Sequence, residues 1–151
     1  MKKKTLKKYL YEGLGFPVEL TDVEMVYLDD EWCPKIDVKK LATMVIKLLP
    51  FQNERLTGSQ IHFVRLYFGM SLRKFSSEVV KESHMAVSKW EKFAEKSTNM
   101  DSNTEIILRL YIYEKLGVKT AKERNNFFNQ YQAIKEVELL RKGPEISLKA
   151  A

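Results

Sequence analysis

The sequence predicts a mainly α-helical fold, in which a bundle of helices follows a small α+β N-terminal piece made of a short hairpin and a helix. Two observations indicate this fold. From Asp37 onward, capping residues recur just ahead of stretches whose apolar residues have helical spacing. Residues 16–36 are instead rich in β-branched and aromatic residues, which favour strands. The chain has 151 residues, 44% of them hydrophobic and 30% charged, as expected of a folded protein with one domain or two small ones.

The hairpin is predicted in the stretch "FPVELTDVEMVYLDDEWCPKI", residues 16–36. Asp29 and Asp30 fall between two apolar stretches, where a turn belongs. Pro17 and Pro34 lie near the ends of the stretch, and proline has no backbone N–H to donate to a sheet. The strands are therefore expected to be short or to lie at an edge.

A helix capped by Asp37 is predicted next, ending before Pro50. Its apolar residues fall on one face, and they are Val38, Leu41, Ala42, Val45, Leu48 and Leu49. Residues 51–56, "FQNERL", then resemble a linker between the N-terminal piece and an all-helical remainder.

Three short helices are predicted after this linker. Thr57 with Gln60 makes a capping box for the first, which ends at Gly69, and Ser71 and Ser83 cap the second and third. Their buried stripes are, in order, Ile61, Val64 and Phe68; Leu72, Phe75 and Val79; and Val87 and Trp90.

Two longer C-terminal helices complete the prediction. Ser102 with Glu105 makes a capping box for a helix ending at Gly117, and Thr120 with Glu123 begins the last one. Their apolar residues are Ile106, Ile107, Leu110, Tyr111 and Tyr113, then Phe127, Tyr131, Ile134 and Val137. We expect these aromatic residues to pack in the core or at a dimer seam, and the tail from residue 143 to be frayed.

Charge is unevenly spread along the chain, whose formal net charge is +6. Residues 1–11 carry five lysines and no acid, and residues 12–36 carry seven acids against Lys35 alone. Residues 57–96 carry seven Lys or Arg against four Asp or Glu. The middle can attract phosphate, whereas the acidic stretch suits a protein contact. The first lysines fit either a solvated tail or a weak phosphate-binding arm.

Several classes of protein are not indicated. Cys33 is the single cysteine, and neither it nor His62 and His84 has zinc-ligand spacing, so we expect no metal, cofactor or internal disulfide and a reducing, cytoplasmic setting. The start resembles no secretory signal, and no apolar stretch is long enough to span a membrane. We find no nucleophile paired with a base and no glycine-rich phosphate loop, so an enzyme such as a nuclease is the least favoured class.

The third short helix has the layout of a helix that enters the DNA major groove. Val87 and Trp90 can point inward and fix its angle, which leaves a face of short or polar side chains. That face holds His84, Met85, Ser88 and Lys89. Ser76, small and midway along the preceding helix, would let the two helices cross closely. His84 fits a surface role and a DNA contact equally well.

The stretch "LTGSQIHFVRLYFGMSLRKFSSEVVKESHMAVSKWE" resembles the lambda-repressor-like, Xre-type helix-turn-helix regulators. The positions that match the family pattern are Arg65, Met70, Ser71, Ser76, Ser83, Val87, Ser88, Lys89, Trp90 and Glu91. The turn "VVKES" is one residue longer than usual and lacks the common glycine. The DNA-facing side also lacks Arg, Asn and Gln, the usual bidentate partners of bases.

The resemblance implies a structural ion pair between Arg65 and Glu91 and a set of DNA-binding residues. This set consists of Ser71, Arg73, Ser83, His84, Met85, Ser88, Lys89 and Lys92. The implied fold is a lambda-repressor-like helix-turn-helix bundle.

The flanking stretches "GLGFPV", "EWCPKID" and "LTG" narrow the resemblance to antitoxin-type regulators related to MqsA, in which an N-terminal part binds a toxin and a C-terminal part binds the operator as a dimer. By this resemblance, residues 1–50 form a hairpin-plus-helix partner-binding region, and residues 57–142 form a DNA-binding domain with C-terminal dimerisation helices. The zinc cysteines of that group are absent, so no zinc site is expected.

The sequence therefore favours a sequence-specific, dimeric, autoregulatory repressor of double-stranded DNA, either an antitoxin with a toxin partner or a phage-like repressor. The alternative is a protein-interaction module. In that case the helix-turn-helix is only a scaffold, and the acidic hairpin around Asp29, Asp30 and Glu31 binds a basic partner.

Overall fold

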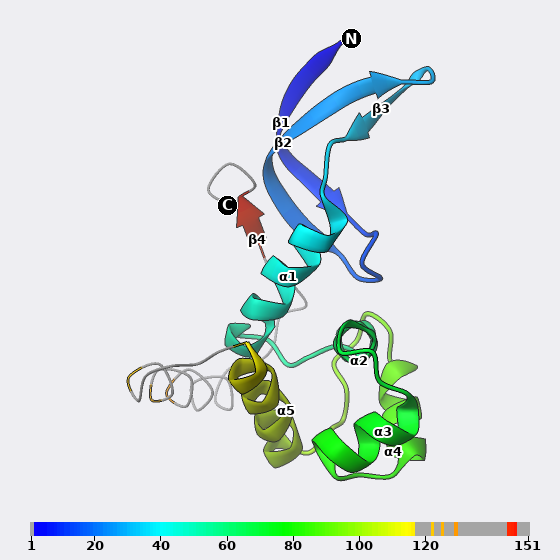
Figure 1. Cartoon of the computed structure of the whole chain (residues 1–151), viewed down its shortest axis with the longest axis vertical. Helices are drawn as coiled ribbons and strands as arrows, with labels where there is room; N and C mark the ends of the chain where they lie inside the picture. The colour runs from blue at the N-terminus through cyan, green and yellow to red at the C-terminus, as the bar shows by residue number, and fades with distance from the viewer. Residues whose placement is uncertain (1, 117–121, 123–124, 126–128, 130–144, 148–151) are drawn as a thin grey trace.

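A computed structural model of the chain describes residues 2–116, 122, 125, 129 and 145–147. A twisted sheet lies at one end of the molecule and the short helices α2, α3 and α4 lie at the other, with α1 running between them (Figure 1). The strands are β1 (Lys3–Tyr11), β2 (Val18–Leu28), β3 (Glu31–Pro34) and β4 (Glu145–Ser147). The helices are α1 (Val38–Leu48), α2 (Gly58–Tyr67), α3 (Leu72–Phe75), α4 (His84–Glu91) and α5 (Ser102–Lys115).

The prediction of a mainly α fold built on a helix-turn-helix bundle is wrong. The described residues form an α+β structure, in which five α-helices accompany an antiparallel sheet ordered β1-β2-β3. β4 adds to this sheet by pairing with β2 in parallel at residues 19–21, so residues 145–147 are not the frayed tail that we expected.

β1 is the strand that the sequence analysis missed. Its lysines were read as a tail or arm, but the strand pairs with β2 over its whole length, from Lys3 opposite Val26 to Tyr11 opposite Val18. Lysines of β1 face acids of β2 on neighbouring positions, with Lys3 Nζ 3.6 Å from a carboxylate oxygen of Glu24. Lys8 Nζ likewise lies 3.5 Å from Glu19, so two of these lysines are paired with acids across the strands.

The hairpin predicted at Asp29 and Asp30 is confirmed. These two residues connect β2 to β3, and both have positive φ angles, 49° and 67°. Such a two-residue turn matches the right-handed twist of the flanking strands, and aspartate tolerates the left-handed conformation well. β3 is a short edge strand as expected, whereas β2, with 11 residues, is the long central strand.

Asp22 lets β2 keep one face buried along its whole length. Val18 and Leu20 are buried before it, and Val23 and Met25 are buried after it, so the alternation shifts by one residue. Asp22 has a φ of 56°, and one residue in the left-handed conformation reverses which face the following side chains take.

The predicted helix at Asp37 is confirmed as α1. The Asp37 carboxylate accepts a hydrogen bond from Lys40 N at 3.2 Å, and a 3₁₀ turn at Leu49–Phe51 follows the helix. Thr57 and Gln60 likewise form the expected capping box of α2.

α5 buries a different face from the one predicted. Its N-cap is Asp101, which accepts from Asn103 N at 3.0 Å, rather than Ser102. Ile107 is 45% exposed, and the buried residues are Thr104, Glu105, Leu108, Arg109 and Ile112. Periodicity of apolar residues misplaced this face because two of its buried members carry charges that pair with each other. The last predicted helix, from Thr120 to Val137, lies outside the described residues apart from three isolated positions.

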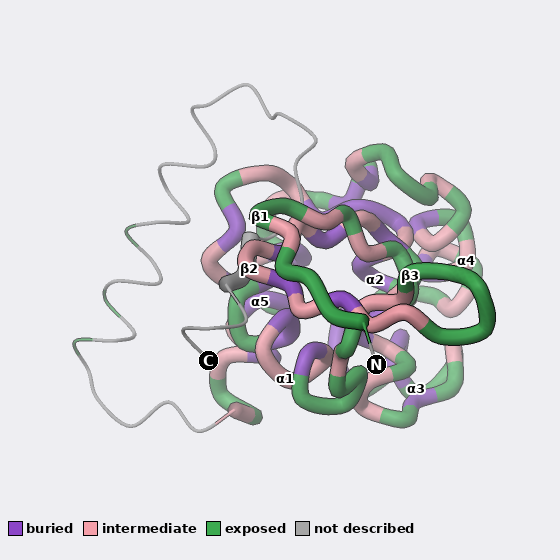
Figure 2. The backbone as a smooth tube through the Cα atoms, turned by 90° about the horizontal axis from the view of Figure 1, so that it is seen from above, coloured by how far each residue is buried: buried purple, intermediate pink, exposed green. Residues whose placement is uncertain are grey.

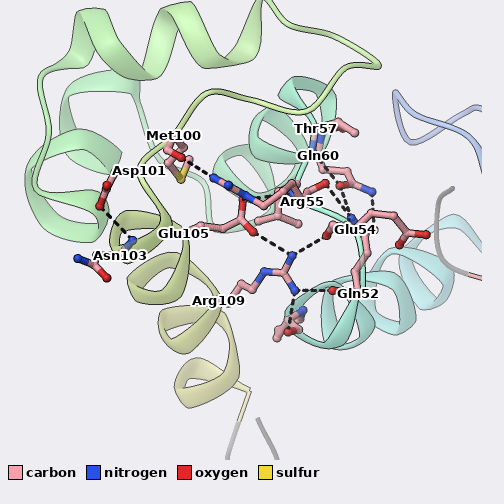
Figure 3. Close-up of polar contacts among 12 residues, drawn as sticks. Gln52, Glu54, Arg55, Thr57, Gln60, Met100, Asp101, Asn103, Glu105 and Arg109 are labelled. Atoms are coloured by element: carbon pink, nitrogen blue, oxygen red, sulfur yellow. Dashed lines mark hydrogen bonds and ion pairs between the residues drawn. The ribbon is translucent and has the colours of Figure 1, made fainter. Parts of the chain in front are cut away.

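Residues 51–56, predicted as a linker, instead pack against Arg109, with Gln52 and Leu56 buried and Asn53 exposed. The guanidinium of Arg109 is fully buried and donates to three backbone carbonyls at or beside this segment (Figure 3). The acceptors are Pro50 O at 3.2 Å, Gln52 O at 2.6 Å and Glu54 O at 2.7 Å.

The carboxylate of Glu105 forms ion pairs with Arg109 and with a second arginine, Arg55. This carboxylate, fully buried, accepts from Arg109 at 3.0 Å and from Arg55 Nε at 2.8 Å. Beside it, the side-chain amides of Gln52 and Gln60 exchange two hydrogen bonds, at 3.0 and 2.8 Å. This buried polar cluster ties α5 and α2 to the chain that leaves α1.

The buried apolar residues form one continuous core, with members in β2, α1, α2, α4 and α5. β1 and the turn between β2 and β3 are largely exposed (Figure 2). Phe16, just before β2, packs edge-on against Phe63 of α2 with ring centroids 5.3 Å apart. The N-terminal and helical regions are thus packed together rather than tethered. Every helix within the described part of the chain is too short or too polar to cross a lipid bilayer.

Candidate nucleic-acid interface

α3 and α4 are joined by a π-helical segment, Ser76–Val80. Backbone N–H groups of Lys81 and Glu82 donate to Ser76 O, so the segment makes the wider turn that accommodates an extra residue. Lys81 follows in the left-handed conformation with φ 55°, at the place where the resembled family commonly has glycine. The longer turn is therefore absorbed by the backbone between the two helices.

α4 is held by its buried side and by its cap. Ser83 Oγ accepts from Ala86 N at 3.1 Å, and Val87 and Trp90 are 0% and 7% exposed. Small side chains aid the close contact with the preceding segment, where Ser76 is buried. The angle of α4 relative to the body is thus set by packing.

The outer side of α4 carries a stripe of exposed residues. Met85 is 63% exposed, and Lys89 and Lys92 are also exposed. These positions are four and three residues apart, so they lie on one face of the helix. We call Met85, Lys89 and Lys92 the lysine stripe. The helix that carries it, α4, lies at the end of the molecule opposite the sheet (Figure 1).

The C-terminal end of α4 lies directly against the start of α2. Gly58 N and Ser59 N donate to the carbonyls of Lys96 and Ala94, at 3.2 and 2.9 Å. A Cβ placed on Gly58 would come within 2.4 Å of Trp90 O. The first turn of α2 thus holds the chain that leaves α4, and only a glycine fits there.

Arg65 and Glu91, the pair that the resemblance implies, lie in contact. Arg65 donates to both carboxylate oxygens, from Nε at 2.8 Å and from NH2 at 2.9 Å, and also to Met70 O at 3.0 Å. His62 Nδ1 contacts the same carboxylate. This cluster ties α2 to the end of α4 and to the chain before α3.

Burial raises the pKa of Glu91, but hydrogen bonds from Arg65 and His62 outweigh it, so the pKa lies below its ordinary value of 4.5. A depressed carboxylate pKa stabilises the fold above pH 4.5, and this contribution is lost as the pH falls through the folded-state pKa.

We therefore expect Glu91→Gln to lower the free energy of unfolding at neutral pH by about 1.5 to 3 kcal/mol, the range for hydrogen bonds to charged groups. The difference from wild type should shrink as the pH falls below 4.5. Urea unfolding at several pH values measures both, with Glu95→Gln, at an exposed site four residues on, as the control. A difference that is independent of pH would contradict this account.

The structure brings most of the predicted DNA-binding residues to the surface. Six are exposed, namely Ser71, Arg73, Ser83, Met85, Lys89 and Lys92. His84 and Ser88 are half-buried. Ser71 caps α3 by accepting from Lys74 N at 3.1 Å, so its hydroxyl already has a backbone partner.

An open groove of about 1120 Å³ runs beside α4, and the sequence analysis missed two residues that line it. Lys96 is exposed and lines the same groove as Lys89 and Lys92, past the end of the helix. The half-buried Phe93 also lines it. Both residues follow the last residue of α4, Glu91, so helical spacing gave no signal for either.

Within the described ranges, no three His, Cys, Asp or Glu side chains gather as a metal site would require. Comparisons with protein-family models, with curated proteins and with solved structures found no match for this chain.

Proposed function

We propose that this protein is a sequence-specific DNA-binding regulator, and that it represses transcription as a homodimer with α4 in the major groove. The observation that carries the proposal is the lysine stripe of α4, which is exposed directly opposite the buried anchors Val87 and Trp90. A helix held this way presents one face to a groove wide enough to admit it.

The exposed cations supply the affinity in this proposal. Lys89, Lys92 and Arg73 contact phosphates, and Ser83 places the start of α4 against the backbone. Met85 and the edges of His84 and Ser88 face the bases, where the methionine favours a thymine methyl group. Direct base readout is modest because none of these side chains makes a bidentate contact.

The resemblance to Xre-type and MqsA-related regulators supports the setting that we propose. Two copies would insert α4 into successive major grooves about 34 to 36 Å apart. The protein would act in the cytoplasm on its own operon, as an antitoxin or a phage-like repressor, and a toxin would be its protein partner in the first case.

The test is a double replacement on the DNA-facing side, Ser88→Glu with Lys89→Glu. Affinity for duplexes that the wild-type protein enriches from a random-sequence library should fall at least about a hundredfold, because two new carboxylates would oppose phosphates. Fluorescence anisotropy with labelled duplexes measures this. Lys47→Glu with Asn53→Glu, at exposed sites in and after α1, makes the same change in charge and should leave affinity nearly unchanged.

The protein-interaction module remains the second candidate, since the outer side of α4 lacks Arg, Asn and Gln. Salt separates the two. A regulator making several phosphate contacts shows a slope of log affinity against log salt of about −0.9 per contact, whereas a module of the second kind enriches no duplex at all. Asp29, Asp30 and Glu31 are exposed at the tip of the hairpin, as this candidate requires, and the ion pairs of the β1 lysines involve Glu19 and Glu24 of β2 instead.

A further inference from the structure

The groove beside α4 combines an apolar wall with a basic rim, and DNA accounts for only the rim. We propose that this groove docks an acidic amphipathic helix of a partner protein, and that docking displaces DNA. The displacement rests on the proposed function, but the docking itself does not.

The apolar side chains of the groove wall have no favourable contact to make with the charged phosphates of DNA. Met85 is 63% exposed, and Phe93 is half-buried yet stands outside the continuous core. Ala86, Trp90 and Met100 continue this wall into the body. Flexible methionine and exposed aromatic surface in a groove is typical of sites that take the apolar face of a helix.

The rim selects the charge of the partner. Lys89, Lys92 and Lys96 all line the groove and are exposed. Of the two acids that also line it, Asp101 is engaged as the N-cap of α5, accepting from Asn103 N. An acidic helix therefore matches the rim, whereas a second copy of this chain, with a formal net charge of +6, would be repelled by it.

Docking and DNA binding use the same cations. Lys89 and Lys92 belong both to the groove and to the proposed phosphate contacts, so one occupant excludes the other. An acidic helix that covers this rim imitates the charge of the DNA backbone. The partner would thus release the repressor from its operator.

The probe is a labelled synthetic peptide of about four helical turns, with leucine and phenylalanine on one face and glutamate on the other. Two control peptides carry lysine in place of glutamate, or alanine in place of the apolar residues. We expect saturable binding of the acidic amphipathic peptide alone, measured by fluorescence anisotropy. Added to the protein–DNA complex, it should release DNA at the concentrations at which it binds.

Two replacements outside the proposed DNA-binding set locate the binding. Phe93→Ala and Lys96→Glu should each weaken the peptide about tenfold, and Phe93→Ala should leave DNA affinity within about twofold. Lys96 is exposed, so its replacement keeps the test valid if Phe93→Ala fails to fold. Leu48→Ala and Lys47→Glu, on the exposed side of α1, are the matched controls and should change neither affinity.

The outcomes separate this inference from the proposed function. The docking site would be overturned if the protein bound DNA but no peptide, if the lysine peptide bound as tightly as the acidic one, or if neither replacement weakened peptide binding. The regulator proposal would stand in each of these cases. The opposite result is also informative. If Phe93→Ala and Lys96→Glu weaken peptide binding but the protein enriches no DNA, the docking site is supported, and both the displacement and the regulator proposal are overturned.

Discussion

Replacing Glu105 with alanine should lower the free energy of unfolding by about 3 to 5 kcal/mol, the cost of leaving one partner of a buried ion pair uncompensated. Glu105 and Arg109 are both 0% exposed, and the same carboxylate accepts from Arg55 Nε at 2.8 Å. Without it, the buried Arg109 and the partly exposed Arg55 both lose their carboxylate partner. Chemical denaturation followed by circular dichroism measures the loss.

The matched control is Glu114→Ala, which removes an exposed carboxylate from the same helix and should cost no more than about 0.5 kcal/mol. Replacing both Glu105 and Arg109 with methionine should not restore full stability, because Arg109 also satisfies three backbone carbonyls. Equal losses for Glu105→Ala and Glu114→Ala would show that the buried cluster contributes nothing to stability.

Replacing Gly58 with alanine should also destabilise the protein, by about 1 to 3 kcal/mol, although alanine is ordinarily the better helix former. The added methyl would lie 2.4 Å from Trp90 O, 2.6 Å from Ala94 N and 2.9 Å from Glu91 O. These are backbone atoms, which cannot rotate away as the end of a side chain can. The end of α4 must therefore move, and DNA affinity should fall with stability.

Ser59→Ala is the control for this change, because it alters the next residue of the same helical turn without adding an atom toward α4. Thermal unfolding and anisotropy with the library-enriched duplexes measure the two effects. If Gly58→Ala were as stable as wild type and bound DNA as well, the contact between α2 and α4 would not position α4.

Local signals predicted the positions of most helix starts correctly. Asp37, Thr57, Ser71 and Ser83 all cap helices, each by accepting a hydrogen bond from a backbone N–H three residues on. Capping depends on a few neighbouring residues, so it can be predicted without knowledge of the rest of the fold. The turn at Asp29–Asp30 could be predicted for the same reason.

The errors concern features that depend on distant partners. β1 was missed because its lysines stay exposed, and the strand is defined by its pairing with β2, which local sequence patterns do not reveal. The buried face of α5 was misplaced because Glu105 and Arg109 become acceptable in a core only when they meet each other and residues 50–56.

In the candidate site, too, the locally determined features were predicted and those set by distant residues were not. The inward direction of Val87 and Trp90, and with it the outward direction of Lys89, follows from helical spacing and was predicted. The half-burial of His84 and Ser88 and the place of Phe93 in a groove were not predicted. Helical spacing does not give the neighbours that cover a residue, and the groove includes Met100 and Asp101, which lie beyond α4.

The sequence by itself determined where most of the helices begin, where the main hairpin turns and which side of α4 faces outward, because capping, turns and helical spacing act between residues close in the chain. Only the tertiary structure decided that the first lysines form a strand, that residues 51–56 pack against Arg109 and that α5 turns its charges inward. The strand depends on pairing with β2, and the charges of α5 are buried favourably only once Arg55 and the carbonyls of residues 50–54 meet them.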